Sequence, residues 1–416
     1  MATWHGMAGS NLVRIERLAP EGDGAAMVDG HVHYVPFALP GETWRAPAAD
    51  GDCWQLVTAS AERQTPPCPH FTRCGGCSAQ HMGDELYLAW KRDAVVRAFA
   101  AQGLAPAIAR LAPVASGTRR RAVLTARQVG AEIVLGYHEP GTHALVDLGA
   151  CPVLDPDIVR AFPSLRALAR VLLGPKIDVR ITVLRVDAGL DVHLETGKAN
   201  LGGPLRLALA DAVRGTSVLR LAVDGEVIVQ PAPVRISLGG IAVEPPPGVF
   251  VQAVPSAEAQ MIALVSEAVA GARRVADLFA GIGTFTFALA RKAQLLAVDS
   301  ELRALTALAA AARGASGLKP IETRVRDLFR EPLARKELEP FDAVVLDPPR
   351  AGAKAQSAML AKATVAKVVM VSCNPSTLAR DVRTLVDGGY ALSRVVSIDQ
   401  FLWSRHVEIV AVLDRR

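Results

Sequence analysis

The run Asp277-Leu278-Phe279-Ala280-Gly281-Ile282-Gly283-Thr284 decides the fold of the C-terminal part of this chain. An apolar strand is predicted over residues 275–279, and a helix over 285–292 follows the glycines. Glycine lets the backbone approach a ligand closely, and a helix N-terminus offers free N–H groups. The run is therefore expected to bind a nucleotide-containing cofactor, with Gly281 and Gly283 as candidate contacts.

The same alternation of strands and helices continues from this loop to the C-terminus. The predicted strands are continuous apolar runs, as expected for a parallel sheet covered by helices on both faces. They lie at residues 295–298, 341–346 and 367–372, and the predicted helices at 302–313 and 377–387. Residues 251–416 are therefore expected to form an α/β Rossmann-like domain.

Acidic residues near the loop indicate which cofactor it binds. Asp299 falls 18 residues after Gly281, at the end of the second strand, where a carboxylate can bind ribose hydroxyls. A dinucleotide site would have a third glycine at position 286, which is Thr286. Asp277 suits the amino group of a methionine moiety better than a pyrophosphate. These features favour S-adenosylmethionine over a plain α/β turn. Asp327 either faces the adenine or is a surface acid.

Candidate reactive groups follow the later strands. Asp347 precedes two prolines at the expected carboxyl edge of the sheet, where such folds bind ligands. Cys373 ends the next strand, just before a helix whose N-terminus is expected to lower its thiol pKa. A thiolate that adds to C6 of a uracil makes C5 nucleophilic, and a base must then remove the C5 proton. Glu408 is the candidate base, with an edge-strand surface acid as the alternative.

Four of the six cysteines form a separate group. Cys68, Cys74 and Cys77 are close in sequence, and Cys151 is distant. Four thiolates with one close pair can hold either zinc or a [4Fe–4S] cluster, and their spacing alone does not decide between the two. Disulfides are not expected, because the chain shows no secretory signal and no apolar run long enough to span a membrane. A cytoplasmic location is expected on the same grounds.

Length and composition set the wider limits. A chain of 416 residues is expected to form two or three domains, and 50% hydrophobic with 21% charged residues is globular composition. The net charge of +5 is compatible with nucleic acid without identifying it. Short alternating strands with Asp-Gly turns, the first at residues 12–18, predict a small β-barrel within residues 1–60. Residues 61–250 are expected to form a central α+β region with strands near residues 133–137, 179–186 and 191–194. In that region Arg119, Arg120 and Arg121 either contact RNA phosphates or form a solvated face.

Together these motifs resemble the RNA uracil-5 methyltransferases, in order and spacing over nearly the whole chain. The resemblance rests on residues 277–284, 347–352, 372–381 and 406–408. It implies that Cys373 is the nucleophile, Glu408 the proton acceptor and Asp347 a further catalytic-site residue. It also implies a set of S-adenosylmethionine contacts: Gln252 in the element Phe250-Val251-Gln252, Asp277, Phe279, Gly281, Gly283, Thr284, Asp299, Asp327 and Asp347. Position 284 often carries asparagine in the family, and position 299 often carries glutamate.

The N-terminal parts resemble particular members of that family. The segment from Cys68 to His81 is similar to the iron–sulfur segment of the 23S ribosomal RNA enzymes, with Cys151 as the fourth ligand, and residues 1–60 resemble the TRAM β-barrel, an RNA-binding module. The resemblance implies a monomeric enzyme that methylates a uridine of 23S rRNA, with tRNA as the alternative target. A methyltransferase for a small molecule and an iron–sulfur RNA-binding protein without catalysis are the other readings.

Overall fold

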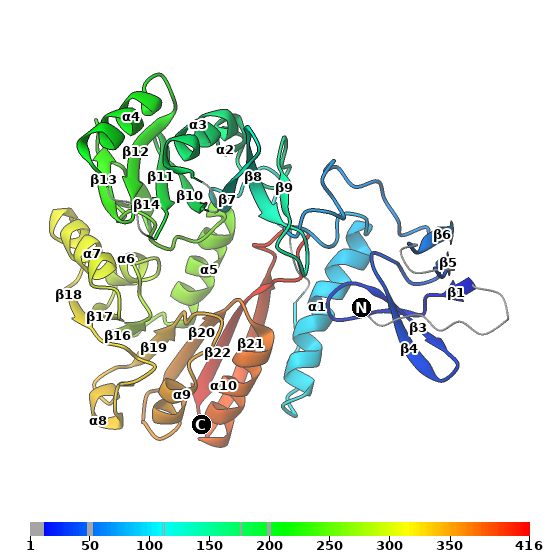
Figure 1. Cartoon of the computed structure of the whole chain (residues 1–416). Helices are drawn as coiled ribbons and strands as arrows, with labels where there is room; N and C mark the ends of the chain where they lie inside the picture. Colours follow the sequence, from blue (N-terminus) through cyan, green and yellow to red (C-terminus); the bar gives the residue numbers. More distant parts are fainter. Residues whose placement is uncertain (1–11, 48–52, 110, 112, 175–176, 198–200) are drawn as a thin grey trace.

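The computed structural model describes residues 12–47, 53–109, 111, 113–174, 177–197 and 201–416. Three β-rich regions follow one another along the chain, with the C-terminal sheet below the central sheet in the view of Figure 1 and the small N-terminal sheets to one side. Parts of the predicted N-terminal domain, residues 1–11 and 48–52, lie outside the described residues. No helix among the described residues is long and apolar enough to cross a membrane.

The N-terminal strands form two small sheets. One has the order β1-β5-β6 and the other β2-β3-β4. The predicted strand over residues 12–18 is split between them, because Ile15 N donates to Glu42 O while Glu16 N donates to Ala25 O. The bounds are β1 (Leu12–Arg14), β2 (Arg17–Leu18), β3 (Gly24–Val28), β4 (His31–Val35), β5 (Thr43–Arg45) and β6 (Gln55–Thr58). The described residues therefore form two sheets with a common small core rather than one continuous barrel sheet.

The central region is a seven-stranded sheet, ordered β13-β12-β11-β10-β7-β8-β9. Its buried strand residues pack with those of the helices α2 to α4 in one apolar core. The predicted strands at 133–137, 179–186 and 191–194 fall within β8, β10 and β11. The bounds are β7 (Arg121–Val129), β8 (Glu132–His138), β9 (Leu145–Asp147), α2 (Pro156–Arg160), α3 (Phe162–Leu172), β10 (Asp178–Val186), β11 (Gly189–Glu195), α4 (Gly203–Val213), β12 (Val218–Val223) and β13 (Glu226–Val229).

The C-terminal region is the expected Rossmann-like sheet, ordered β18-β17-β16-β19-β20-β22-β21. Strand β17 sends Leu296 and Val298 into one core cluster and Ala297 into another, so both faces are covered and the strands read as continuous apolar runs. The strands are β16 (Arg274–Leu278), β17 (Gln294–Asp299), β18 (Ile321–Val325), β19 (Ala343–Leu346), β20 (Lys367–Ser372), β21 (Tyr390–Ile398) and β22 (Glu408–Arg415). The helices are α5 (Pro255–Ala268), α6 (Thr286–Ala290), α7 (Leu302–Gly314), α8 (Arg335–Leu338), α9 (Lys354–Leu360) and α10 (Pro375–Asp387).

The sheet is mixed, which corrects the prediction of a purely parallel one. Strand β22 pairs antiparallel with both β20 and β21. The reason is the short connection from Ile398 to Glu408, which returns the chain beside β21 without a crossover helix. As a result Glu408, the first residue of β22, lies at the edge where β16, β17, β19 and β20 end. That edge also carries Asp347 and Cys373.

Helix α1 (Asp84–Ala100) connects the N-terminal half to the C-terminal sheet. It packs against α10, and its buried residues belong to the core cluster of the C-terminal sheet. The hairpin β14 (Ile236–Leu238) and β15 (Ile241–Val243) packs against α7 in the same way. The span 61–250 is therefore not one packing unit, although its central sheet has a core of its own.

A buried ion pair fixes α1 to the segment before Glu408. Lys91 Nζ donates to Asp399 and to Phe401 O, and Tyr87 Oη donates to Asp399 at 2.5 Å. The side chains of Lys91 and Asp399 are both fully buried. Removing one partner of a buried pair leaves an uncompensated charge, which costs more than the pair gains.

We expect Lys91→Met to lower the free energy of unfolding by about 3–5 kcal/mol, the usual cost of breaking a buried ion pair. Urea unfolding followed by circular dichroism measures it. Arg335→Ala is the control, because Arg335 forms an exposed pair with Glu339 on α8 and should cost no more than about 0.5 kcal/mol. Equal effects of the two changes would contradict the assignment.

Candidate active site

One cavity of about 610 Å³ lies at the edge of the sheet where the reactive groups meet. Ligand sites in open α/β sheets lie at this edge, and the volume is in the range of ligand pockets. Nine of the predicted site residues line it: Gln252, Phe279, Gly281, Thr284, Asp299, Asp327, Asp347, Cys373 and Glu408. Asp277 and Gly283 do not, and His193 and Glu195 of the central sheet close one side.

The cofactor loop has the backbone geometry of a ligand turn. Phe279 adopts a left-handed conformation with φ 63°, which is uncommon for a non-glycine residue and typical of functional turns. Gly283 has φ 100°, and a Cβ there would lie 2.6 Å from the ring of Phe287. Gly283 is therefore required for the packing of the loop onto the helix that follows, while Gly281 faces the cavity.

The predicted cofactor carboxylates lie in different environments. Asp277 is fully buried and accepts a hydrogen bond from Thr286 Oγ1 at 2.5 Å, while its Oδ1 has no partner. Burial raises its pKa to about 7. Asp299 lines the cavity and accepts from the backbone N–H groups of Gly281 and Glu301, each at 2.9 Å. Asp327 also lines the cavity and accepts from Phe329 N at 2.9 Å. Asp299 and Asp327 thus reach the cavity, and Asp277 supports the loop from behind.

Two exposed aromatic residues of the cavity, Phe329 and Phe250, were not predicted as site residues. Phe329 is 48% exposed, and its ring lies 5.4 Å from that of Phe279. Phe250 is 64% exposed, with the Arg121 guanidinium 5.7 Å from its ring centroid. Exposed rings at a cavity offer flat apolar surfaces for the faces of a base. The sequence could have indicated both residues by their positions. Phe329 follows Asp327 by two residues, and Phe250 precedes Gln252 by two residues.

A chain of buried amides connects two carboxyl groups in the cavity. Gln252 Nε2 donates to Asp347 Oδ2 at 3.1 Å, and Gln400 Nε2 donates to Gln252 Oε1 at 2.8 Å and to Glu408 Oε2 at 3.1 Å. Burial and the nearby Asp277 raise the pKa of Asp347 to about 7. Burial and Asp347 raise the pKa of Glu408 well above its ordinary value. Gln400 was not foreseen from the sequence, because no motif contains it.

The prediction of a lowered pKa for Cys373 is wrong. Burial, followed by the negative charges of Glu408 and Asp347, raises the pKa of this thiol to about 11. The N-terminus of α10 does not offset this, because the Asn374 side chain caps the helix by accepting from the N–H groups of Ser376 and Thr377. The cap also explains why the helix begins at Pro375, two residues before its predicted start.

Alkylation of Cys373 by iodoacetamide is expected to be slow at neutral pH. The rate follows the thiolate fraction, and a pKa near 11 instead of 9.0 lowers that fraction roughly a hundredfold at pH 8. The rate should therefore rise about tenfold per pH unit up to pH 10 or beyond. Peptide mapping by mass spectrometry measures it, with the exposed Cys53 in the same sample as a reactive comparison. A plateau below about pH 8 would contradict the raised pKa.

Comparison with known proteins assigns the site to a family. A model of tRNA (uracil-5-)-methyltransferases matches residues 220–416. A 23S rRNA (uracil(1939)-C(5))-methyltransferase of Chromohalobacter salexigens is 34% identical, with 96% of this chain and 88% of that relative aligned. The chain belongs to the RNA uracil-5 methyltransferase family. It is therefore an S-adenosylmethionine-dependent RNA methyltransferase.

Further relatives match this RNA methyltransferase over 97% of its length. An uncharacterized RNA methyltransferase of Rhizobium meliloti is 45% identical over 97% of this chain and 99% of the relative. The structure of a Pyrococcus abyssi tRNA (uracil-54, C5)-methyltransferase, in complex with S-adenosyl-L-homocysteine, superposes with a TM-score of 0.76 at 23% identity. It covers 97% of this chain and 99% of the other, which confirms the multidomain fold with a C-terminal Rossmann-like sheet.

The four predicted metal-binding cysteines of the methyltransferase line a second cavity, of about 210 Å³. All four are free and partly buried. Burial and the other three thiols raise the pKa of Cys77 to about 12. Among the described residues no group of three or more Cys, His, Asp or Glu side chains is arranged to hold a metal ion. The structure thus brings Cys68, Cys74, Cys77 and Cys151 to one cavity without a compact ligand set.

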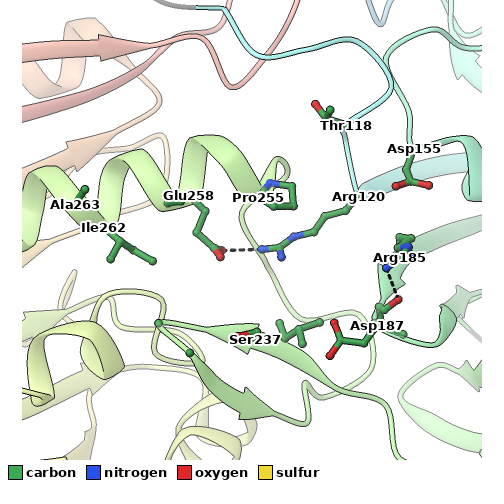
Figure 2. Close-up of a pocket in the computed structure, with 15 residues that line it drawn as sticks. Thr118, Arg120, Asp155, Arg185, Asp187, Ser237, Pro255, Glu258, Ile262 and Ala263 are labelled. Carbon is green, nitrogen blue, oxygen red and sulfur yellow. Dashed lines mark hydrogen bonds and ion pairs between the residues drawn. The ribbon is translucent and has the colours of Figure 1, made fainter.

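The basic run of the methyltransferase has three separate environments. Arg119 lines the cysteine cavity, with its guanidinium 5.8 Å from the ring centroid of Phe401. Arg120 is only 9% exposed; it pairs with Glu258 of α5 at 2.7 Å (Figure 2) and donates to Gln252 O. Arg121 lies over Phe250 beside the active-site cavity. The three do not form one solvated face, and Arg120 serves to fix Gln252.

The ion pair between Arg120 and Glu258 lies in a further cavity, which has a volume of about 580 Å³. Figure 2 shows this cavity between α5, the β14–β15 hairpin and the end of β10. None of the predicted catalytic, cofactor or metal residues lines it. Its Arg120–Glu258 pair, with a buried guanidinium and carboxylate, connects the central sheet to the C-terminal one, which is a structural role.

Proposed function

We propose that this methyltransferase transfers a methyl group to C5 of a uridine in 23S rRNA through a covalent adduct between Cys373 and C6 of the base. The observation that carries the proposal is the convergence of Cys373, Asp347 and Glu408 on the cavity that also contains the cofactor loop. S-adenosylmethionine supplies an electrophilic methyl group there. Gln252, Phe279, Gly281, Thr284, Asp299, Asp327 and Asp347 are the proposed contacts, with Asp277 and Gly283 shaping the loop.

The proposed reaction has three steps: addition of the thiol, methyl transfer and elimination. Sγ of Cys373 gives its proton to solvent and bonds to C6, which moves the electron pair of the C5=C6 double bond into an enolate. C5 of that enolate would bond to the methyl carbon of S-adenosylmethionine as the methyl–sulfur bond breaks, with S-adenosylhomocysteine as the leaving group. Glu408 then removes the C5 proton, the pair of the C5–H bond restores the C5=C6 double bond, and the C6–S bond breaks to release the thiolate. Burial and the two carboxylates raise the pKa of Cys373, so the thiol is the predominant form at neutral pH in the free enzyme.

The target RNA is inferred from the N-terminal half. In sequence, residues 1–60 and the segment from Cys68 to His81 resemble the TRAM and iron–sulfur segments of the 23S ribosomal RNA enzymes, and a relative at 34% identity carries that name. A tRNA uracil-5 methyltransferase is the second candidate, and a methyltransferase for a small molecule is less consistent with the two N-terminal regions. Mass-spectrometric mapping of 5-methyluridine in rRNA and tRNA, with and without the gene, tests this. Loss from tRNA alone would overturn 23S rRNA as target, and loss from neither would overturn the uridine assignment.

We further propose that the cysteine cavity of this enzyme holds a [4Fe–4S] cluster. A cluster would place four thiolates around a larger volume than one zinc ion bound at about 2.3 Å from each sulfur. The volume of the cavity, about 210 Å³, and its lining by all four cysteines support the cluster. Its positive metal ions would offset the mutual repulsion of the thiolates. Anaerobic purification should give a brown protein, and a colourless protein with one equivalent of zinc would overturn the proposal.

A further inference from the structure

Gln400 lies behind the active-site cavity and connects its two sides. It is only 2% exposed, and it is not among the cavity's lining residues. Its side chain bonds to Gln252, a proposed cofactor contact, and to Glu408, the proposed base. Through Gln252 the connection reaches Asp347. A buried amide that donates to both a cofactor contact and a base is a candidate for orienting these two side chains.

The donors and acceptors in the hydrogen bonds that join Asp347, Gln252, Gln400 and Glu408 can be assigned. Val254 N–H can only donate, and it contacts Gln400 Oε1 at 3.4 Å. Gln400 Nε2 therefore faces Gln252 Oε1 and Glu408 Oε2. Gln252 Nε2 then faces Asp347 Oδ2. The backbone amide thus removes the O/N ambiguity of both glutamines.

The arrangement makes the two oxygens of Glu408 unequal. Oε2 accepts from Gln400, whereas Oε1 receives no hydrogen bond from the described residues. A proton on Oε2 would face a donor, so protonation there is opposed. Oε1 is the oxygen left for a proton taken from a substrate. Gln400 therefore distinguishes the two oxygens of Glu408.

We propose that Gln400 is a positioning residue for proton abstraction: it holds Glu408 by Oε2, favours its carboxylate form and leaves Oε1 for the C5 proton. This inference rests on the proposed function. In the step, the C5–H pair restores the C5=C6 double bond, the Cys373–C6 bond breaks and the proton goes to Oε1. Gln400 does not line the cavity and acts through Glu408.

The segment around Gln400 is held rigidly enough for this role. Asp399, its neighbour, is fixed by Lys91 and Tyr87 of α1, and Trp403 N donates to Tyr87 Oη at 2.8 Å. Trp403 O in turn accepts from the backbone N–H groups of Ser78 and Ala79. On the other side, Arg120 donates to the carbonyl of Gln252. Neither glutamine is free to follow a displaced Glu408.

Besides burial, two side chains act on the titration of Glu408. Asp347 after β19 raises its pKa together with burial, and Gln400 lowers it. Cys373 after β20 is coupled to both carboxylates, and Arg350 acts on that thiol in the opposite direction. Gln400 is thus the group that counteracts burial and Asp347 at Glu408. Removing its amide should raise the Glu408 pKa and move the acidic limb of proton abstraction to higher pH.

Gln400→Met tests the proposal, because it keeps a side chain of similar length and removes both donors. Gln356→Met is the matched control: Gln356 is also buried and lies on α9, and among the described residues its side chain bonds only to the backbone of Leu333. Single turnovers use 23S rRNA and tRNA labelled with [5-³H]uridine from a strain lacking the gene, at saturating S-adenosylmethionine. Tritium release reports loss of the C5 proton, and an SDS-stable RNA–protein band reports the adduct. Both are followed between about pH 6 and 9.

We expect Gln400→Met to release tritium roughly 10- to 100-fold more slowly at neutral pH, the factor expected for losing one hydrogen bond to a charged group. Its adduct should accumulate, and its acidic limb should lie about one pH unit above that of the wild type. Gln356→Met should match the wild type. A Gln400→Met profile equal to wild type, or slowed equally at every pH, overturns the proposal.

Two further outcomes of this experiment have different meanings. If Gln400→Met does not fold by circular dichroism, Gln400→Asn decides through the same readouts, because it retains an amide at a shorter reach. An adduct with a shifted acidic limb supports the proposal, and a wild-type profile overturns it. If the wild-type enzyme itself releases no tritium from either RNA, the proposed function has failed.

Discussion

Replacing Cys373 by alanine is expected to abolish methyl transfer, with a rate loss on the order of 10⁴-fold or more. C5 of uracil is not nucleophilic until a sulfur adds to C6, so no other group in the cavity replaces the thiol. Cofactor binding should persist, because Cys373 lies beyond the glycine loop, at the end of β20. Transfer of a labelled methyl group to RNA measures the first quantity, and calorimetry with S-adenosylmethionine measures the second.

The matched control for that change is Cys53→Ala. Cys53 is exposed and lies outside both the active-site cavity and the cysteine cavity. Its loss should leave methyl transfer within about twofold of wild type, in line with surface substitutions in general. A Cys373→Ala enzyme that methylates RNA within tenfold of wild type would refute covalent catalysis.

Much of the active site could be predicted from the order of strands. Asp347 and Cys373 each follow an apolar run, and the carboxyl ends of neighbouring parallel strands meet at one edge. Glu408 shares that edge for a different reason, since it begins an antiparallel strand. The apolar pattern of a buried antiparallel strand is the same as that of a parallel one. The motif at residues 406–408 identified Glu408 as a candidate base. Its place at this edge of the sheet became known only from the tertiary fold.

What the sequence could not predict depends on contacts between distant residues. The pKa of Cys373 is set by burial, Glu408 and Asp347, and a cap residue uses the helix N–H groups that were expected to lower it. Arg120 looked like part of a basic face, yet it pairs with Glu258, 138 positions away. Gln400 belongs to no motif and acquires its place only when β21 and β22 pair. In each case the partner lies on another element.

Glu408→Gln is expected to stop the reaction at a later stage than Cys373→Ala. Without the base, the methylated adduct retains its C5 proton and its bond to Cys373, so turnover should fall by on the order of 10²- to 10⁴-fold while an SDS-stable RNA–protein band accumulates. The carboxylate is the active form, and its raised pKa places the acidic limb of wild-type turnover well above the ordinary value of 4.5, so activity should rise with pH through that limb.

Denaturing gels with labelled RNA distinguish the two variants. Glu408→Gln should give the band and Cys373→Ala should not, and the double variant should resemble Cys373→Ala, because the adduct needs the sulfur. Glu339→Gln, on the exposed end of α8, should turn over normally. A Glu408→Gln enzyme that releases methylated RNA at the wild-type rate would show that another group removes the proton. In that event Asp347, which lines the same cavity and whose pKa is raised by burial to about 7, would be the next residue to replace.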